Sequence, residues 1–163
     1  MSKSFDIPDN YINGTYIGDL YVHEEMESMG SLFENCAIFI YKYFNVNISK
    51  LKFVETFMTS HIRKLMDEWH PRLMSQYSSD TIKAFVEVDL NNKDFHKIQG
   101  EDYEYYHENE LRWIGMMYAY MRNEEKISSV ELYKKYDLEF MRHFYVWGHQ
   151  MSFSGAYNRL KNY

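Results

Sequence analysis

Proline limits where a helix can run, and this chain of 163 residues contains only two, Pro8 and Pro71. Because proline lacks a backbone N–H and its ring clashes with the preceding turn, long stretches without it are free to form helices. Glycine, which weakens a helix interior, is also scarce at seven residues. These two features predict a mainly helical chain.

Apolar residues recur at intervals of three and four, which is the period of a helix with one buried face. One such pattern runs from Met26 to Phe44. A second opens at Ser49 and ends at His70, because the following Pro71 holds that residue out of the helical region. Ser60 is a candidate cap that would divide this second pattern into two helices.

The segment from about Asn109 to Arg122 is apolar on almost every face, which is typical of a central helix. Gly115 would permit a neighbouring helix to approach closely, because it has no side chain. The expected core residues are Trp113, Ile114, Gly115, Tyr118, Met121 and, from the preceding pattern, Trp69.

Three shorter helices are expected after this central one. Ser128 and Glu131 have the spacing of a capping box, Asp137 is a candidate cap for the next helix, and Ser152 or Ser154 for the last. Before the central helix, Ser78 or Ser79 is a candidate cap for a helix through about Phe85.

The sequence pattern of residues 83–98 is compatible with two structures, a helix and a β-hairpin. Val86, Val88 and Leu90 alternate with acidic residues before a turn-like "NN", as in a half-buried hairpin, whereas the preceding residues favour a helix.

The chain has no internal repeat and no linker rich in proline, glycine or serine. We therefore predict an irregular single-domain bundle of about six helices over residues 1–163, with a small β-hairpin near residues 83–98 as the open alternative and a loosely ordered N-terminal lead at about residues 1–15.

Charge and cysteine content narrow the class of protein. The formal net charge of -6 weighs against non-specific binding to nucleic acid, which requires a positive field. The single Cys36 lies in the apolar run "CAIFIY" and cannot form an internal disulfide, so it is expected to be a core residue in a reducing compartment. No apolar run approaches the ~18 residues of a membrane span. The prediction is a cytoplasmic protein that does not enter a membrane.

Motifs that identify common enzyme classes are missing from the sequence. There is no HExxH, GxGxxG, phosphate-binding loop, CxxC or GxSxG. His143 and His149 are six residues apart, which places them on different faces of a continuous helix. We expect no catalytic residue, no metal ligands and no cofactor. A hard-ion or mixed metal site around Asp102, Glu104 and His107 stays open as the alternative.

The stretch "GEDYEYYHENE", residues 100–110, places five carboxylates and three tyrosines directly before the central helix. Glu108 and Glu110 suit the first helical turn, where negative charge is stabilised, and Glu108 is four residues before Arg112, a spacing typical of a surface ion pair. The earlier carboxylates have no such role and alternate with tyrosines, a combination suited to binding a basic partner. The predicted partner-binding residues are Glu101, Asp102, Tyr103, Glu104 and Tyr105.

Two segments, "FVETFMTSHIRKLMDEWHPRLMSQYSSDTI" (53–82) and "LRWIGMMYAYMRNEEKISSVELYKKYDLEFM" (111–141), resemble small helical proteins of low-GC Gram-positive bacteria and their mobile elements. In those proteins a Trp-x-Gly helix precedes a capped short helix. The resemblance implies an antitoxin-type or phage-defence-associated protein. We expect a non-enzymatic acidic module that neutralises a toxin or nuclease-type effector by occluding its functional or nucleic-acid-binding surface, without contacting nucleic acid itself. The alternative is a small enzyme or ligand-binding protein that uses the carboxylate and histidine cluster at residues 101–110.

Overall fold

Eight α-helices and one 3-10 helix make up the part of the chain described by the structure, a computed structural model that covers residues 22–68, 73 and 76–162. They are α1 (Val22–Phe44), α2 (Lys50–Met58), α3 (His61–Asp67), α5 (Ser78–Val88), η2 (Phe95–Lys97), α6 (Glu110–Glu125), α7 (Ser129–Lys135), α8 (Leu138–Gly148) and α9 (Phe153–Lys161). The prediction of a mainly helical chain is confirmed, although the helices outnumber the six expected. The predicted N-terminal lead at residues 1–15 lies outside the described residues.

Side-chain caps begin most of the shorter helices at the residues that the sequence suggested. The caps are Ser49 for α2, Ser60 for α3, Ser128 for α7, Asp137 for α8 and Ser152 for α9. Each side chain accepts a hydrogen bond from the backbone N–H three residues on, which satisfies a donor that the helix leaves unpaired. The prediction of a serine cap for α5 is wrong, because its N-cap is Tyr77 and no side chain caps it.

Helices α1 and α6 pack along each other more extensively than any other two elements and form the centre of the molecule. At their contact a Cβ atom on Gly115 would lie 2.4 Å from the carbonyl oxygen of Met29, so only glycine allows this approach. The predicted close approach at Gly115 is confirmed. On the facing helix, a Cβ atom on Gly30 would lie 2.7 Å from Cγ of Met116.

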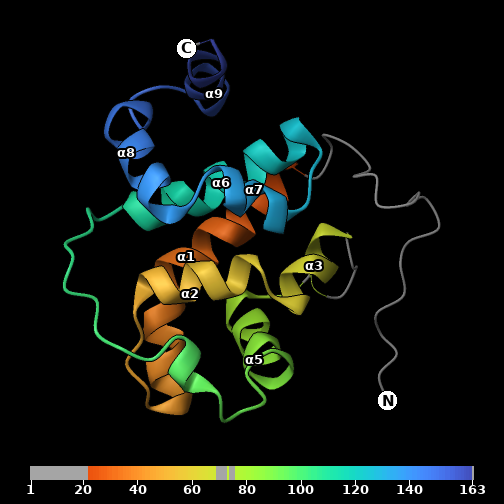
Figure 1. Ribbon diagram of the computed structural model, residues 1–163, viewed down its shortest axis with the longest axis vertical. Coiled ribbons are helices and arrows are strands. Elements are labelled where there is room, and N and C mark those ends of the chain that lie inside the picture. The colour runs from red at the N-terminus through yellow and green to blue at the C-terminus, as the bar shows by residue number, and fades with distance from the viewer. Residues whose placement is uncertain (1–21, 69–72, 74–75, 163) are drawn as a thin grey trace.

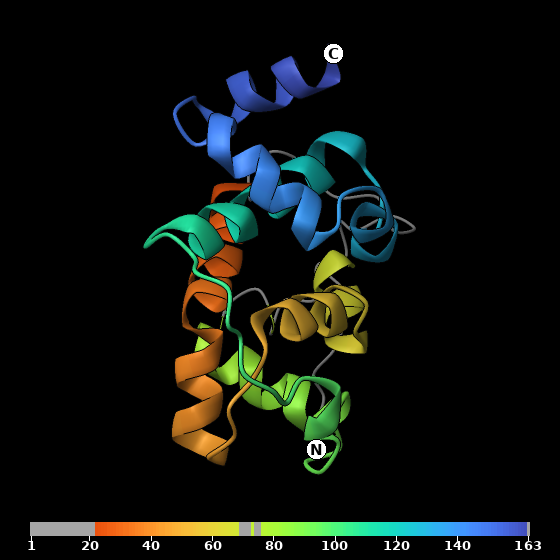
Figure 2. The same cartoon turned by 60° about the vertical axis from the view of Figure 1, so that its left-hand side comes forward.

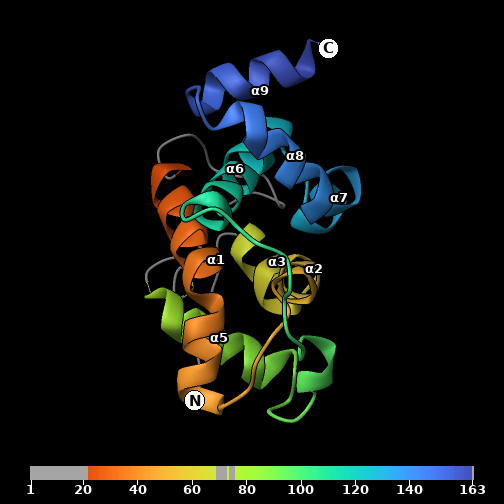
Figure 3. The same ribbon diagram turned by 90° about the vertical axis from the view of Figure 1, so that its left-hand side faces the viewer.

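The remaining helices are arranged along α1 (Figures 1 and 2). Helix α5 and the short η2 lie toward its C-terminal end, α2 and α3 lie beside its middle and contact α7, and α7, α8 and α9 lie around α6 toward its N-terminal end. Figure 3 shows that residues 100–109 form a segment without regular secondary structure, which passes α2 on its way from η2 to the start of α6. This segment therefore connects the two ends of the molecule along one side.

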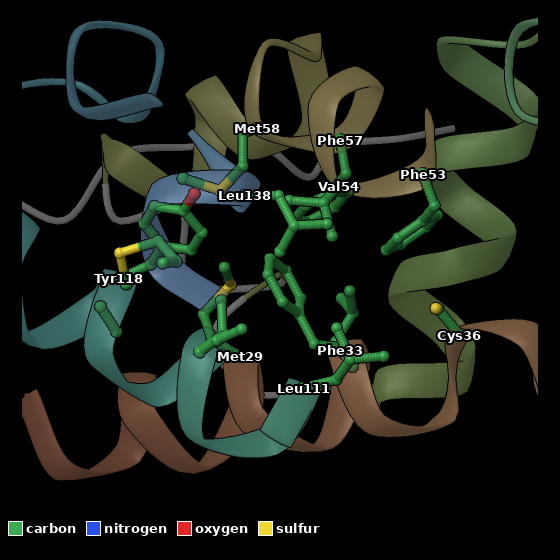
Figure 4. Packing of buried hydrophobic residues seen from close by; sticks show 14 of the residues in the cluster. Met29, Phe33, Cys36, Phe53, Val54, Phe57, Met58, Leu111, Tyr118 and Leu138 are labelled. Carbon is green, nitrogen blue, oxygen red and sulfur yellow. The ribbon is translucent and has the colours of Figure 1, made fainter. Parts of the chain in front are cut away.

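Aromatic rings fill the core between α1, α2 and α5 (Figure 4). The rings of Phe33, Phe53, Phe57 and Phe85 lie with centroids 5.5 to 6.4 Å apart in edge-to-face and stacked pairs. Such pairs add stability beyond the burial of their area. On the other side of Phe33, the hydroxyl of buried Tyr118 donates to the backbone oxygen of Tyr136 at 2.6 Å.

The expected core residues of α6 are buried. Ile114, Tyr118 and Met121 have no exposed surface, and Trp113 retains 8%. The Trp113 ring packs edge-on against Phe144 of α8, with ring centroids 5.2 Å apart. The sixth expected core residue, Trp69, lies outside the described residues.

Residues 83–98 do not form a hairpin. Helix α5 continues to Val88, a turn follows, and η2 completes the segment, so no strands pair within it. Asn91 and Asn92 have φ angles of 48° and 58°. Two successive residues with positive φ are typical of a tight hairpin turn, but here they reverse the chain after a helix. The amide of Asn92 donates to the Val86 carbonyl at 3.0 Å, which closes the end of α5.

A buried ion network links α1, α3, α6 and α7. Nη2 of Arg63 donates to Oε1 of Glu25 at 2.8 Å, and Nε of Arg122 lies 2.8 Å from Oδ1 of Asp67. Both oxygens of Asp67 also accept from Ser129, at 2.6 Å from the backbone amide and 2.7 Å from the hydroxyl. Two arginines thus balance two carboxylates, which is the condition for tolerating these charges out of water.

Candidate functional site

The acidic loop, defined as residues 100–109, is held to the rest of the protein near its start. The adjoining Gln99 forms an isolated antiparallel bridge with Ile48. Two residues into the loop, Oδ2 of Asp102 accepts a hydrogen bond from the backbone amide of Lys50 at 3.1 Å. This amide belongs to the first turn of α2, so the loop adds a second cap to that helix.

Arg142 of α8 fastens the other half of the acidic loop. Its Nε donates to Oε2 of Glu110 at 2.7 Å, its Nη1 pairs with Glu104, and its Nη2 donates to the backbone oxygen of Tyr105 at 2.6 Å. The guanidinium also lies 4.1 Å from the ring centroid of Tyr106. One side chain thereby fixes the loop, the start of α6 and α8 relative to one another.

These contacts correct two expectations about the acidic stretch. The view that Asp102 and Glu104 lack structural partners is wrong, as the contacts above show. The predicted pair between Glu108 and Arg112 is also not formed, because Arg112 instead lies 2.7 Å from Glu27 and 3.6 Å from Glu34. Both of those carboxylates are on α1, and the close packing of α1 on α6 brings them to Arg112.

A groove of about 720 Å³ lies between the acidic loop, α2, α7 and α8. We call it the acidic groove. Its lining residues are Leu51, Glu55, Glu104, Tyr105, His107, Glu110, Tyr133, Asp137, Leu138, Glu139, Arg142, His143, Tyr145 and Val146. Five carboxylates and one guanidinium among them leave four uncompensated negative charges when the histidines are neutral.

The five carboxylates of the acidic groove differ in how they are already engaged. Glu104 and Glu110 share Arg142, and Oδ1 of Asp137 accepts the capping hydrogen bond from the amide of Phe140 at 2.9 Å. Glu55 and Glu139 are exposed, and within the described part of the chain neither has a basic side chain at ion-pair distance. These two carboxylates are therefore available to a cation from outside.

Apolar and aromatic side chains border the same groove. Leu51 is 46% exposed, Val146 is 67% exposed and Tyr105 is 76% exposed. Large apolar groups beside uncompensated charge are typical of protein-binding surfaces, where the apolar part supplies affinity and the charges supply orientation.

The described residues do not indicate metal binding by the histidines of the groove or a reactive thiol at Cys36. His107 and His143 both line the acidic groove, but the described residues contain no group of three or more His, Cys, Asp or Glu side chains placed to hold a metal ion. Cys36 lies in the core, where burial raises the pKa of its thiol to about 12, an effect that Lys50 opposes only in part. The thiol therefore remains protonated, and unreactive, near neutral pH.

The predicted partner-binding residues divide into two groups. Glu104 and Tyr105 line the acidic groove, whereas Glu101, Asp102 and Tyr103 do not. The Tyr103 ring is 87% exposed, and its hydroxyl donates to Oε2 of Glu101 at 2.9 Å.

Sequence reasoning missed Glu55, Asp137 and Glu139 as members of the same groove. Asp137 was recognised only as a helix cap. Asp137 and Glu139 lie at the start of α8, where capping and the helix dipole explain an acid, and Glu55 is a single acid in the middle of α2. Nothing in their local sequence therefore marks them as part of a site.

Comparison with models of protein families, with curated proteins and with solved structures found no match to this chain. No helix in the described part of the chain is long and apolar enough to cross a membrane. The features of this protein that bear on function are therefore those of the acidic groove.

Proposed function

We propose that this protein is a non-enzymatic, acidic protein-binding module that neutralises a protein partner by binding a basic segment of that partner in the acidic groove. The observation that carries the proposal is the pair of uncompensated carboxylates, Glu55 of α2 and Glu139 of α8, which line the same groove as exposed Leu51 and Val146. Within the chain, the guanidinium of Arg142 already pairs with two carboxylates of this groove, which is the same interaction that a lysine or arginine of a partner would make.

The expected partner is a toxin or nuclease-type effector whose own function depends on a basic surface. Such surfaces bind nucleic acid by neutralising phosphates. An acidic module that covers one of them would block that contact without binding nucleic acid itself. This role agrees with the resemblance of residues 53–82 and 111–141 to antitoxin-type and phage-defence-associated proteins, and with a cytoplasmic setting, both of which stay predictions.

Tyr103 and Glu101 fit this proposal as a second contact next to the groove. Both are exposed, and the tyrosine ring offers a large rigid surface with a polar tip. Asp102 has a more limited part, because its carboxylate already caps α2.

A small cationic ligand in the acidic groove is the second candidate function. The observation in its favour is the volume of about 720 Å³, which is within the range of ligand pockets. It would engage the carboxylate and histidine cluster of residues 101–110 through Glu104, His107 and Glu110. A small ligand would compete with Arg142 for its carboxylates, whereas a protein partner has the exposed rim available as well.

Selection from a displayed library of random peptides tests the proposal without knowledge of the partner. We expect peptides enriched in lysine and arginine to be selected on the wild-type protein. The variant Glu55→Gln/Glu139→Gln should lose this enrichment. The matched control Glu24→Gln/Glu87→Gln removes the same charge from exposed helix positions away from the groove and should retain it. Equal enrichment on all three proteins would show that the acidic groove is not the binding site.

A further inference from the structure

A second groove lies on the other flank of α8, between α8 and α9. It has a volume of about 500 Å³ and is lined by Phe140, His143, Phe144, Trp147, Arg159 and Leu160. We call it the aromatic groove. Four of its six lining residues are apolar or aromatic, so it differs in chemistry from the acidic groove.

Helix α8 forms the ridge between the two grooves. Glu139, Arg142 and Val146 line the acidic groove, whereas Phe140, Phe144 and Trp147 line the aromatic groove. Within each set the residues recur at intervals of three and four, which places each set on one flank of the helix. His143 lines both grooves and is exposed, so the two surfaces meet at this residue.

The charge on the two flanks has opposite sign. The acidic groove carries uncompensated carboxylates, whereas the rim of the aromatic groove carries Arg159, whose guanidinium lies 5.4 Å from the Trp147 ring centroid. Arg159 is exposed, and in the described part of the chain no carboxylate lies at ion-pair distance from it. A cation at the rim of an apolar groove suits a bulky apolar side chain next to a carboxylate.

We infer that one segment of a partner protein straddles α8, with lysine or arginine in the acidic groove and a bulky apolar side chain, followed by a carboxylate, in the aromatic groove. The opposite charges on the two flanks fix which part of this segment lies in which groove. The inference rests on the proposed function, because it assigns the second half of the same bound segment.

The same displayed peptide library tests this inference with different variants. On the wild-type protein, we expect selected peptides to carry a basic cluster and, at a constant spacing, an aromatic, leucine or methionine residue next to aspartate or glutamate. Selection on Arg159→Glu should replace that acidic position with a basic one. Selection on Leu160→Ala should weaken the apolar preference and leave the basic cluster unchanged.

A spectroscopic measurement locates the apolar residue of the leading wild-type peptide. Because Trp147 lines the aromatic groove, its fluorescence should change on peptide binding, and the change should be lost in Trp147→Phe. We expect Arg159→Glu to weaken binding of that peptide by about tenfold, the loss typical of a contact that contributes strongly to an interface. The exposed residue Lys64, away from both grooves, provides the control Lys64→Glu, which makes the same charge change and should bind the peptide with unchanged affinity.

The outcomes separate this inference from the proposed function. Selected peptides that are basic but have no apolar position, with unchanged Trp147 fluorescence, would overturn the inference and leave the acidic groove as the binding site. Peptides that are apolar but not basic would overturn the proposed function. A library that yields no binding peptide would contradict both.

Discussion

Arg142 of α8 and Glu110, the first residue of α6, form an ion pair in which Nε and Oε2 are 2.7 Å apart and the Glu110 side chain is 3% exposed. Breaking a buried pair by removing one partner leaves the other charge unpaired and typically costs about 3 to 5 kcal/mol. Because the Arg142 side chain is 24% exposed, we expect Arg142→Met to lower the free energy of unfolding by about 3 kcal/mol. Urea denaturation measures this loss.

Two companion variants identify the cause of the lower free energy of unfolding expected for Arg142→Met. Glu104→Gln removes the exposed partner of Arg142 and should change stability by less than about 1 kcal/mol. The double variant Arg142→Met/Glu110→Gln should recover part of the loss, because it removes the buried charge. If the double variant is no more stable than Arg142→Met alone, the unpaired carboxylate is not the cause.

The capping residues show what could be predicted from the sequence. Ser49, Ser60, Ser128, Asp137 and Ser152 are local signals, because each side chain bonds an amide only three residues away. The central helix was predictable for a similar reason, since its apolar pattern covers almost every face. Helix identity therefore followed from short-range chemistry.

The parts that could not be predicted depend on long-range packing. Alternation at Val86, Val88 and Leu90 suits a strand as well as a helix end, and only the fold decides that no second strand is there to pair. The acidic groove brings together Glu55 and Glu139, which are far apart in sequence and ordinary in their local settings. Only the placement of α2 opposite α8 creates the charge excess.

Substitution of the central glycines tests the contact between α1 and α6. At Gly115 a Cβ atom would meet backbone atoms of Met29, which cannot move without shifting a helix, whereas at Gly30 the nearest atom belongs to the flexible side chain of Met116. We expect Gly115→Ala to destabilise the protein by about 3 kcal/mol and Gly30→Ala by less. Thermal unfolding of both variants compares them. Equal losses, or a larger loss for Gly30→Ala, would contradict the close backbone contact.

Trp113 joins α6 to α8 and α9, because its ring lies against Phe144, Tyr145 and Phe153 at centroid distances of 5.2, 5.5 and 5.9 Å. Truncation to alanine leaves a cavity, and we expect Trp113→Ala to lower the free energy of unfolding by about 3 to 5 kcal/mol. The control Val146→Ala, at an exposed position of α8, should change it by about 0.5 kcal/mol or less. Chemical denaturation measures both. An unchanged midpoint for Trp113→Ala would contradict this packing.

The lowered pKa of Glu125 predicts that part of the protein's stability is lost in acid. Burial alone would raise its pKa, but hydrogen bonds from Lys135, Tyr136 and Tyr157 outweigh burial, so the pKa lies below its ordinary value of 4.5. The folded protein then binds fewer protons at Glu125 than the unfolded chain does. The stability from this residue is complete above about pH 4.5 and is lost as the pH falls through the lowered pKa.

The variant Glu125→Gln isolates this component. It should be less stable than the wild type at pH 7, and the difference between the two should shrink as the pH falls below 4.5. The neighbouring exposed residue provides the control Glu124→Gln, which should change the free energy of unfolding at pH 7 by about 0.5 kcal/mol or less. A constant gap between Glu125→Gln and the wild type, measured by denaturation at each pH, would rule out the lowered pKa.

Nuclear magnetic resonance titration with an oligoarginine peptide tests the central claim, that a basic segment binds in the acidic groove. We expect the backbone amide signals of Glu55, Glu139 and Val146 to shift with saturation, and the shifts to weaken with added salt, because exposed charges are screened over ~8 Å at physiological ionic strength. The variant Glu55→Gln/Glu139→Gln should lose the saturable shifts. Weak, non-saturating shifts spread equally over exposed acids elsewhere, such as Glu24 and Glu87, would contradict the proposal that this groove is the binding site.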